Sequence, residues 1–151
     1  MSFFRGVWCP YCNLELLALQ EALPEIRSRG ADLVVISPQT AANSRSSTRT
    51  THLELAMLVD KGNVVASEFG LRFRLPEDLI ALYRRLGNDL PVVNGEDSWT
   101  LPMPARFVIG PDGIIRYAEV NPDYSIRPDP HDLLPVLDRL RVRSHRVQGR
   151  T

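Results

Sequence analysis

The chain has 151 residues, enough for one domain with a single substantial core, and we treat residues 1–151 as one domain. Apolar residues make up 44% and charged residues 24%, as in ordinary soluble globular proteins. Lysine plus arginine equals aspartate plus glutamate at 18 each, so no basic surface is indicated and we expect no nucleic-acid partner. The longest aliphatic run, Leu33–Ile36, is too short to cross a bilayer, so we also expect no membrane association.

The N-terminal segment lacks the pattern of a secretion signal. It has no basic flank followed by a long apolar run and a small-residue cleavage site. We therefore expect a cytoplasmic protein. Because structural disulfides are rare in that compartment, a close pair of cysteines is better interpreted there as redox or metal chemistry.

The first part of the chain predicts a strand, a helix and a second strand. Residues 3–8 are a short apolar run typical of a buried strand, and Pro10 suits the first position of a helix, where its missing N–H is not needed. Apolar residues recur at helical spacing over 12–29, although Pro24 is expected to kink or divide this helix. Residues 31–37 predict a central strand. The helix positions expected to face the core are Leu14, Leu17, Ala18, Ala22, Leu23 and Ile26.

The middle of the chain predicts short elements and one long connection. Residues 38–51 are polar and predict a loop or a weak exposed helix. A short strand over 55–59 and a short helix over 63–69 follow, and Pro76 opens a helix over 76–87. Residues 88–104 are interpreted as a long connection, and a connection of that length inside a compact domain is often functional.

The last part predicts a hairpin and a final helix. Two apolar runs, 105–109 and 114–120, flank a turn rich in glycine and proline. Residues 131–142 predict an amphipathic helix, and residues 144–151 a flexible tail. The order β-α-β, excursion, β-β-α requires a parallel pair with a right-handed crossover and an antiparallel pair. An α/β fold with one mixed central sheet flanked by helices on both faces satisfies both requirements.

The two cysteines, Cys9 and Cys12, are separated by two residues where a strand meets a helix. The unpaired N–H groups and the dipole at a helix N-terminus stabilise a thiolate, so the first cysteine can titrate below the free-thiol pKa of about 8.5. We expect Cys9 to be the nucleophile, exposed at the tip, and Cys12 to be the more buried resolving thiol. We also expect an intramolecular Cys9–Cys12 disulfide on mild oxidation. Arg5 adds to thiolate stabilisation only if its orientation brings it to the site.

Two other interpretations of the cysteines stay open. A structural zinc site needs four ligands, but the three histidines, His52, His131 and His145, are scattered along the chain. The second alternative is a pair of inert core cysteines with an accidental spacing. The C-x-x-C spacing in a β-α-β setting favours a redox pair over both, and we expect no metal and no cofactor.

Four segments resemble one known family. Residues 4–13, FRGVWCPYCN, resemble the reactive-cysteine segment of the peroxiredoxin-like proteins grouped with alkyl hydroperoxide reductase and thiol-specific antioxidant. The likeness runs from residue 3 to residue 140, nearly the whole chain. The other three segments, in the family's order, are Ile36–Gln39, Asp60–Gly70, and Leu101–Ala105 with Phe107–Ile109 and Asp112-Gly113.

The resemblance implies a thioredoxin-like fold and an enzyme that reduces peroxides or disulfides with electrons from a thiol donor such as thioredoxin or glutathione. It also implies that Pro104 is the cis proline placed beside the reactive cysteine in this fold, with Met103 across from Cys9. Trp8, Tyr11 and Met103 are the expected substrate contacts. The resemblance leaves a homodimer open. Because family members usually have residues before the cysteine-bearing strand, we expect an N-terminally shortened version of the fold.

Three positions depart from the family pattern. Gly6 and Ser2 stand where the family has a threonine and a proline, and Pro104 stands where it has an arginine. Arg106 is the candidate replacement donor, if the strand carries it to the site. Because these donors stabilise the charge that develops on peroxide, we expect Cys9 to reduce disulfides readily and peroxide slowly. The alternative is a redox-inactive module that binds a partner through residues 88–104.

Overall fold

The structure, a computed structural model, describes residues 1–148, without the side chains of residues 47, 49–51 and 142–148. The last helix continues to Gln148, so the backbone of residues 144–148 is helical. The remaining part of the tail expected over 144–151 lies outside the described residues. Among the helices described, none is long and apolar enough to span a bilayer.

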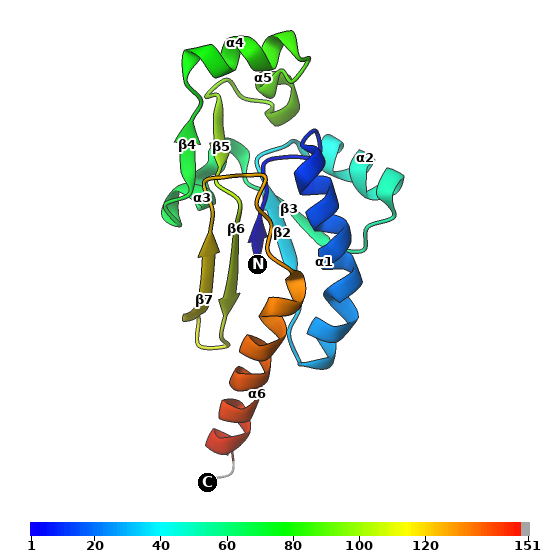
Figure 1. Ribbon diagram of the computed structural model, residues 1–151, viewed down its shortest axis with the longest axis vertical. Coiled ribbons are helices and arrows are strands. Elements are labelled where there is room, and N and C mark those ends of the chain that lie inside the picture. Colours follow the sequence, from blue (N-terminus) through cyan, green and yellow to red (C-terminus); the bar gives the residue numbers. More distant parts are fainter. Residues whose placement is uncertain (149–151) are drawn as a thin grey trace.

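Five strands form a mixed central sheet in the order β3-β2-β1-β6-β7. Strand β1 pairs in parallel with β2 and antiparallel with β6, so it joins the β-α-β half of the sheet to the hairpin half (Figure 1). The predicted mixed sheet is therefore confirmed. The strands are β1 Ser2–Phe3, β2 Val34–Ser37, β3 Ala56–Val59, β6 Ala105–Ile109 and β7 Ile115–Val120.

Helices cover both faces of this sheet. Val35 and Val108 lie in the core that packs against α1 and α6. Their neighbours along the strands, Ile36 and Phe107, point to the other face, where they pack with Ala66 of α3. The helices are α1 Pro10–Ser28, α2 Ala41–Thr51, α3 Val64–Glu68, α4 Glu77–Arg85, α5 Leu90–Asn94 and α6 Leu134–Gln148, with 3-10 turns at Lys61–Asn63 and Pro130–Leu133.

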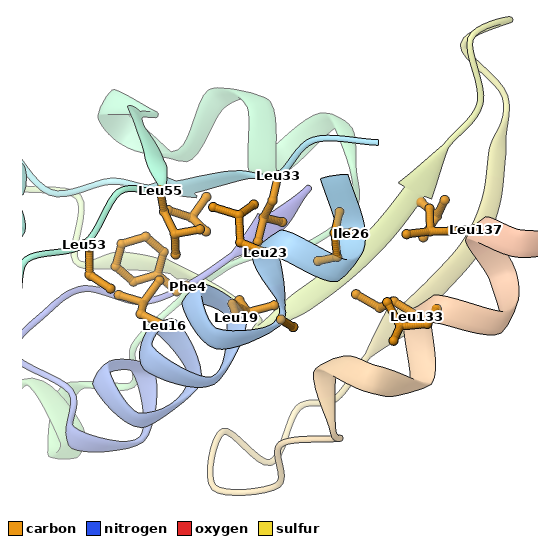
Figure 2. Close-up of a cluster of buried hydrophobic side chains, with 14 of the residues drawn as sticks. Phe4, Leu16, Leu19, Leu23, Ile26, Leu33, Leu53, Leu55, Leu133 and Leu137 are labelled. Carbon is orange, nitrogen blue, oxygen red and sulfur yellow. The ribbon is translucent and has the colours of Figure 1, made fainter. Parts of the chain in front are cut away.

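Helix α1 begins at Pro10, as the sequence predicts, and runs through Pro24 without being divided. Its buried face agrees with the predicted one in the second half of the helix, where Ala22, Leu23 and Ile26 are buried. In the first half it differs, because Leu14 and Leu17 are 67% and 45% exposed. Apolar residues occupy most of the turn, so periodicity alone does not choose between adjacent faces. Packing between the sheet and α6 chooses the other face (Figure 2). The buried residues are Cys12, Glu15, Leu16, Leu19, Ala22, Leu23 and Ile26.

A second small sheet and two helices form a cap at one end of the molecule (Figure 1). Strands β4 (Arg72–Arg74) and β5 (Thr100–Pro102) pair there, and α4 and α5 lie above them. The prediction of a long connection over 88–104 is therefore wrong, because this segment contains α5 and β5. Both elements are too short for their apolar residues to show a helical or strand periodicity in the sequence. The core of the cap consists of Leu75, Ile80, Leu90, Trp99 and Leu101, with Trp8 and Tyr83 packed against it.

Candidate active site

The segment between β1 and α1 carries the first cysteine, and it is held as a fixed loop. The strand predicted over residues 3–8 ends at Phe3. The N–H of Val7 donates to Oε1 of the fully buried Gln39 at 3.0 Å, and Nδ2 of Asn13 donates to the carbonyl of Val7 at 2.8 Å. Cys9 then caps α1, so its thiol lies at the positive end of the helix dipole.

Gly6 is required by the shape of this loop. Its φ angle is +148°, which side chains disfavour, and a Cβ atom there would lie 2.4 Å from Nε1 of Trp8. The indole of Trp8 therefore occupies the space that a side chain at position 6 would need. This contact explains why glycine stands where the family pattern has threonine.

Replacing Gly6 with alanine is expected to destabilise the protein by more than about 1–3 kcal/mol, the usual cost of a strained backbone, because Trp8 must also move. The measurement is the free energy of unfolding in urea. Gly113→Ala is the matched control, since Gly113 has a φ of +76° but no atom within 4 Å of its Cβ position. Equal losses in the two variants would contradict the contact with Trp8.

Both cysteines are buried: Cys9 is 2% exposed and Cys12 0%. The expectation of an exposed Cys9 is therefore wrong, because Cys9 packs into the hydrophobic core that contains Phe4 and Leu16. Both cysteines are free thiols, with no disulfide between them. The hydrogen bond from Cys12 lowers the pKa of Cys9 to about 6 against an opposing effect of burial, with further help from Arg5 and Arg127. The same hydrogen bond and burial raise the pKa of Cys12.

The difference between the pKa values of Cys9 and Cys12 predicts how the amount of Cys9 thiolate depends on pH. A lowered pKa means that the Cys9 thiolate is present above pH 6 and is protonated as the pH falls through that value. Cys12→Ala removes the hydrogen-bond donor and is expected to raise the Cys9 pKa, whereas Cys12→Ser keeps a donor and should raise it less. Thiolate absorbance against pH measures both. A midpoint in Cys12→Ala as low as in the wild type would contradict the proposed cause.

Arg5 is a buried cation beside the thiols, in contact with aromatic rings. It is 3% exposed, and its guanidinium carbon lies 4.1 Å from the ring centre of Tyr124 and 4.9 Å from that of Trp8. Arg5 also donates a hydrogen bond to the hydroxyl of Tyr83. The aromatic faces stabilise its charge without neutralising it as a carboxylate would. The positive charge of Arg5 therefore helps to lower the pKa of Cys9. Arg5 is thus oriented toward the site, as its predicted contribution to thiolate stabilisation requires.

A second buried charge cluster lies on the Cys12 side. Nη1 of Arg127 pairs with Glu15 at 2.8 Å, and Nη2 donates to Sγ of Cys12 at 3.4 Å. Nε of Arg106 pairs with the same carboxylate at 3.0 Å. Arg106 thus pairs with Glu15, and a role for its guanidinium at Cys9 stays a prediction. The sequence analysis missed Arg127 and Glu15, although Glu15 is three residues after Cys12 on the buried face of α1.

The prediction of a cis proline at Pro104 is wrong. No peptide bond among residues 1–148 is cis, and trans is the isomer that X–Pro bonds favour by about 0.5–1 kcal/mol. The N–H of Met103 donates to the carbonyl of Leu71 at 2.8 Å, and its side chain packs against the core that contains Phe3. This packing fixes Met103 by the edge of the cap, and its contact with substrate stays a prediction.

The other two predicted substrate contacts lie close to the thiols. Tyr11 is 43% exposed, and its ring lies 5.8 Å from that of Tyr124. Trp8 is half-buried, with its ring 5.5 Å from that of Tyr83. A cavity of about 550 Å³ opens beside α1, with Tyr11 and Arg127 in its lining. No group of three His, Cys, Asp or Glu side chains suited to a metal ion occurs in the part of the chain that the structure describes.

The fold and the site define a class: thioredoxin-fold proteins with two neighbouring cysteines at the N-terminus of their first long helix. The AhpC/TSA family matches residues 1–118, and the chain belongs to this family. It is 24% identical over 131 residues to a chloroplastic peroxiredoxin Q of Triticum aestivum, covering 87% of this chain. The chain spans 49% of the length of that relative.

Solved peroxiredoxins share the fold. A peroxiredoxin 6 of Arenicola marina superposes with a TM-score of 0.72 at 16% identity, covering 95% of this chain and 60% of the other. AhpC of Enterococcus faecalis gives a TM-score of 0.68 at 19% identity, covering 99% and 76% of the two chains. PrxQ of Xylella fastidiosa gives 0.66 at 15% identity, covering 95% and 75%. The predicted thioredoxin-like fold and the family resemblance are therefore confirmed.

Proposed function

We propose that the protein is a thiol peroxidase in which Cys9 and Cys12 form the redox pair. The observation that carries this proposal is the place of the two cysteines: Cys9 caps α1 and Cys12 lies buried in its first turn, with the buried cation Arg5 in the loop before them. The lowered pKa of Cys9 and the raised pKa of Cys12 agree with this arrangement. One sulfur is therefore a thiolate at neutral pH while the other keeps its proton. This is the division of roles that a nucleophile and a resolving thiol require.

The reaction balances in two steps. The Cys9 thiolate attacks one oxygen of the peroxide, the S–O bond forms, the O–O bond breaks, and the leaving oxygen takes up a proton, giving a sulfenic acid and water or an alcohol. The sulfur of Cys12 then attacks that of Cys9; the S–S bond forms, and hydroxide leaves as water with the proton of Cys12. A thiol donor, such as thioredoxin or glutathione, reduces the disulfide.

Burial favours a small oxidant. Because Cys9 is 2% exposed, hydrogen peroxide or a small hydroperoxide can reach its sulfur more easily than a protein disulfide can. The leaving oxygen needs a fixed positive group, and Arg5 is a buried cation beside Cys9. These two features weigh against the expectation that peroxide reacts slowly.

Disulfide reduction is the second candidate function. Gly6 supplies no side chain to a leaving oxygen, and disulfide exchange needs less of its surroundings because sulfur is a good leaving group. A redox-inactive binding module remains the alternative from another class. The proposal includes a cytoplasmic location, and it leaves open whether the protein forms a homodimer.

Stopped-flow reaction of the reduced protein with hydrogen peroxide and with a small disulfide, side by side, tests the proposal. A rate constant with peroxide above about 10⁵ M⁻¹s⁻¹, within the enzymatic range of kcat/KM, supports a peroxidase. Arg5→Met should lower that rate, whereas Arg74→Met, which changes an exposed ion pair with Glu77, should not. Faster reaction with the disulfide favours the second candidate, and no reaction with either favours the binding module.

A further inference from the structure

We propose that Tyr83 is a catalytic residue that gives its hydroxyl proton to the leaving oxygen when Cys9 cleaves a peroxide. The inference rests on the proposed function, because it assigns a proton donor to the first step of that cycle. Tyr83 lies in α4 of the cap, far from Cys9 in the sequence. Its hydroxyl nevertheless forms a hydrogen bond with Arg5, in the loop that leads to Cys9.

Helix α4 holds the ring of Tyr83 against this loop. Ile80, one turn earlier in α4, is 3% exposed and lies in the core of the cap, and Tyr83 on the same face of the helix packs against that core. The ring of Tyr83 lies 5.5 Å from that of Trp8, the residue before Cys9. The ring centre is also 5.8 Å from the guanidinium carbon of Arg5. The cap therefore places a phenol beside the reactive cysteine.

The hydroxyl of Tyr83 can donate a proton. An arginine side chain has only N–H donors, so the oxygen of Tyr83 is the acceptor in the contact with Arg5. Among the described residues, no group accepts the proton of this hydroxyl. Burial raises the pKa of Tyr83 against the opposing effect of Arg5, and the charge of Cys9 adds to the rise. The phenol therefore stays protonated at neutral pH and lies within electrostatic reach of the Cys9 thiolate.

The groups around the phenol are donors that lack acceptors. In the part of the chain that the structure describes, the guanidinium of Arg5 has no carboxylate partner, and its Nε is buried without a hydrogen bond. Nε1 of Trp8 is also buried without a partner. Buried donors without acceptors are costly, so a small molecule with oxygen acceptors would satisfy groups that the protein leaves unpaired. A peroxide brings two oxygens.

The proposed step balances as follows for hydrogen peroxide. The Cys9 thiolate attacks one oxygen, the S–O bond forms, and the electron pair of the breaking O–O bond goes to the other oxygen, which takes the proton of Tyr83. The products are a sulfenic acid, water and the Tyr83 phenolate. Hydroxide is a far stronger base than a phenolate, whose conjugate acid has a pKa of about 10, so this transfer is favourable. Arg5 stabilises the phenolate, and the half-buried ring regains its proton from water.

Tyr83→Phe removes the hydroxyl and keeps the ring beside Trp8. In stopped-flow mixing, the rate constant with hydrogen peroxide should fall at least about tenfold, below the usual 10²–10⁴-fold of general acid catalysis because water can partly replace the phenol. With peroxyacetic acid the fall should be less than about threefold, because acetate leaves as a stable anion that needs no proton. Alkylation of Cys9 by iodoacetamide, which reports on the thiolate alone, should match the wild type.

Tyr117→Phe is the matched control, because the hydroxyl that it removes donates to Glu119 on β7, and it should match the wild type with all three reagents. An unchanged rate of Tyr83→Phe with hydrogen peroxide would overturn the inference and leave the proposed function intact. An equal fall with peroxyacetic acid or in alkylation would also overturn it, because the hydroxyl would then act on the thiolate rather than on the leaving oxygen. If the wild type does not react with hydrogen peroxide, the proposed function and the inference both fail.

Discussion

Replacing Cys12 with serine is expected to stop the reaction after one oxidation of Cys9. The hydroxyl of serine can keep a hydrogen bond to the Cys9 thiolate, so the first step should survive, but it cannot form a disulfide. Turnover with thioredoxin as the donor should fall by at least about a hundredfold, because a disulfide is the form that such donors attack. Intact-mass analysis after one equivalent of peroxide should show a gain of one oxygen in the variant and a loss of two hydrogens in the wild type.

Cys9→Ser is the matched control, and it should fail to react in the first step as well. A different result would be that Cys12→Ser keeps turnover within about threefold of the wild type and accumulates disulfide-linked dimers. In that case Cys9 of one chain pairs with Cys9 of another, and the catalytic cycle is intermolecular. That outcome would also remove the role assigned to Cys12, although not the lowered pKa of Cys9.

Replacing Glu15 with alanine is expected to lower the free energy of unfolding by about 3–5 kcal/mol, the usual cost of removing one partner from a buried ion pair. Arg106 is 3% exposed and would lose its carboxylate without reaching water, whereas Arg127 lies closer to the surface and can relax more easily. Unfolding in urea, which does not screen charges, measures the loss. Glu15→Gln keeps the shape and an acceptor, and should lose less.

Glu21→Ala is the matched control, because Glu21 lies on the same helix but is exposed. Surface substitutions of this kind usually change stability by less than about 0.5 kcal/mol. Equal stability of Glu15→Ala and Glu21→Ala would show that the two arginines do not depend on Glu15. The fixed position of Arg127 next to Cys12 would then need another explanation.

Much of the fold could be predicted from local signals. Pro10 marks the start of α1 because proline tolerates the first helical position, and the hairpin of β6 and β7 follows from two apolar runs around a turn. The α4 helix after Pro76 is also local. The elements α5 and β5 could not be found in this way. They have only three to five residues, which is too few for a repeating pattern of apolar residues to appear in the sequence.

The features of the candidate site also fall into those that local sequence signals predict and those that they do not. The sequence by itself determined the two neighbouring cysteines and their place at a helix N-terminus, because Cys9 and Cys12 lie on one helical turn. Which of them is the nucleophile stays a prediction. The sequence misjudged the exposure of Cys9 and the isomer at Pro104, because both depend on packing between elements that are far apart in the sequence.

Only the tertiary structure decided which charges serve which sulfur. Arg5 acts on Cys9 because rings from the cap and from the segment after β7 enclose it, and Arg127 acts on Cys12 because the chain returns to α1 after 115 residues. Arg106, although closer in sequence to the expected position, pairs with Glu15 instead. Electrostatic effects depend on distance through space and on burial, and neither can be calculated from sequence spacing once the residues lie on different elements.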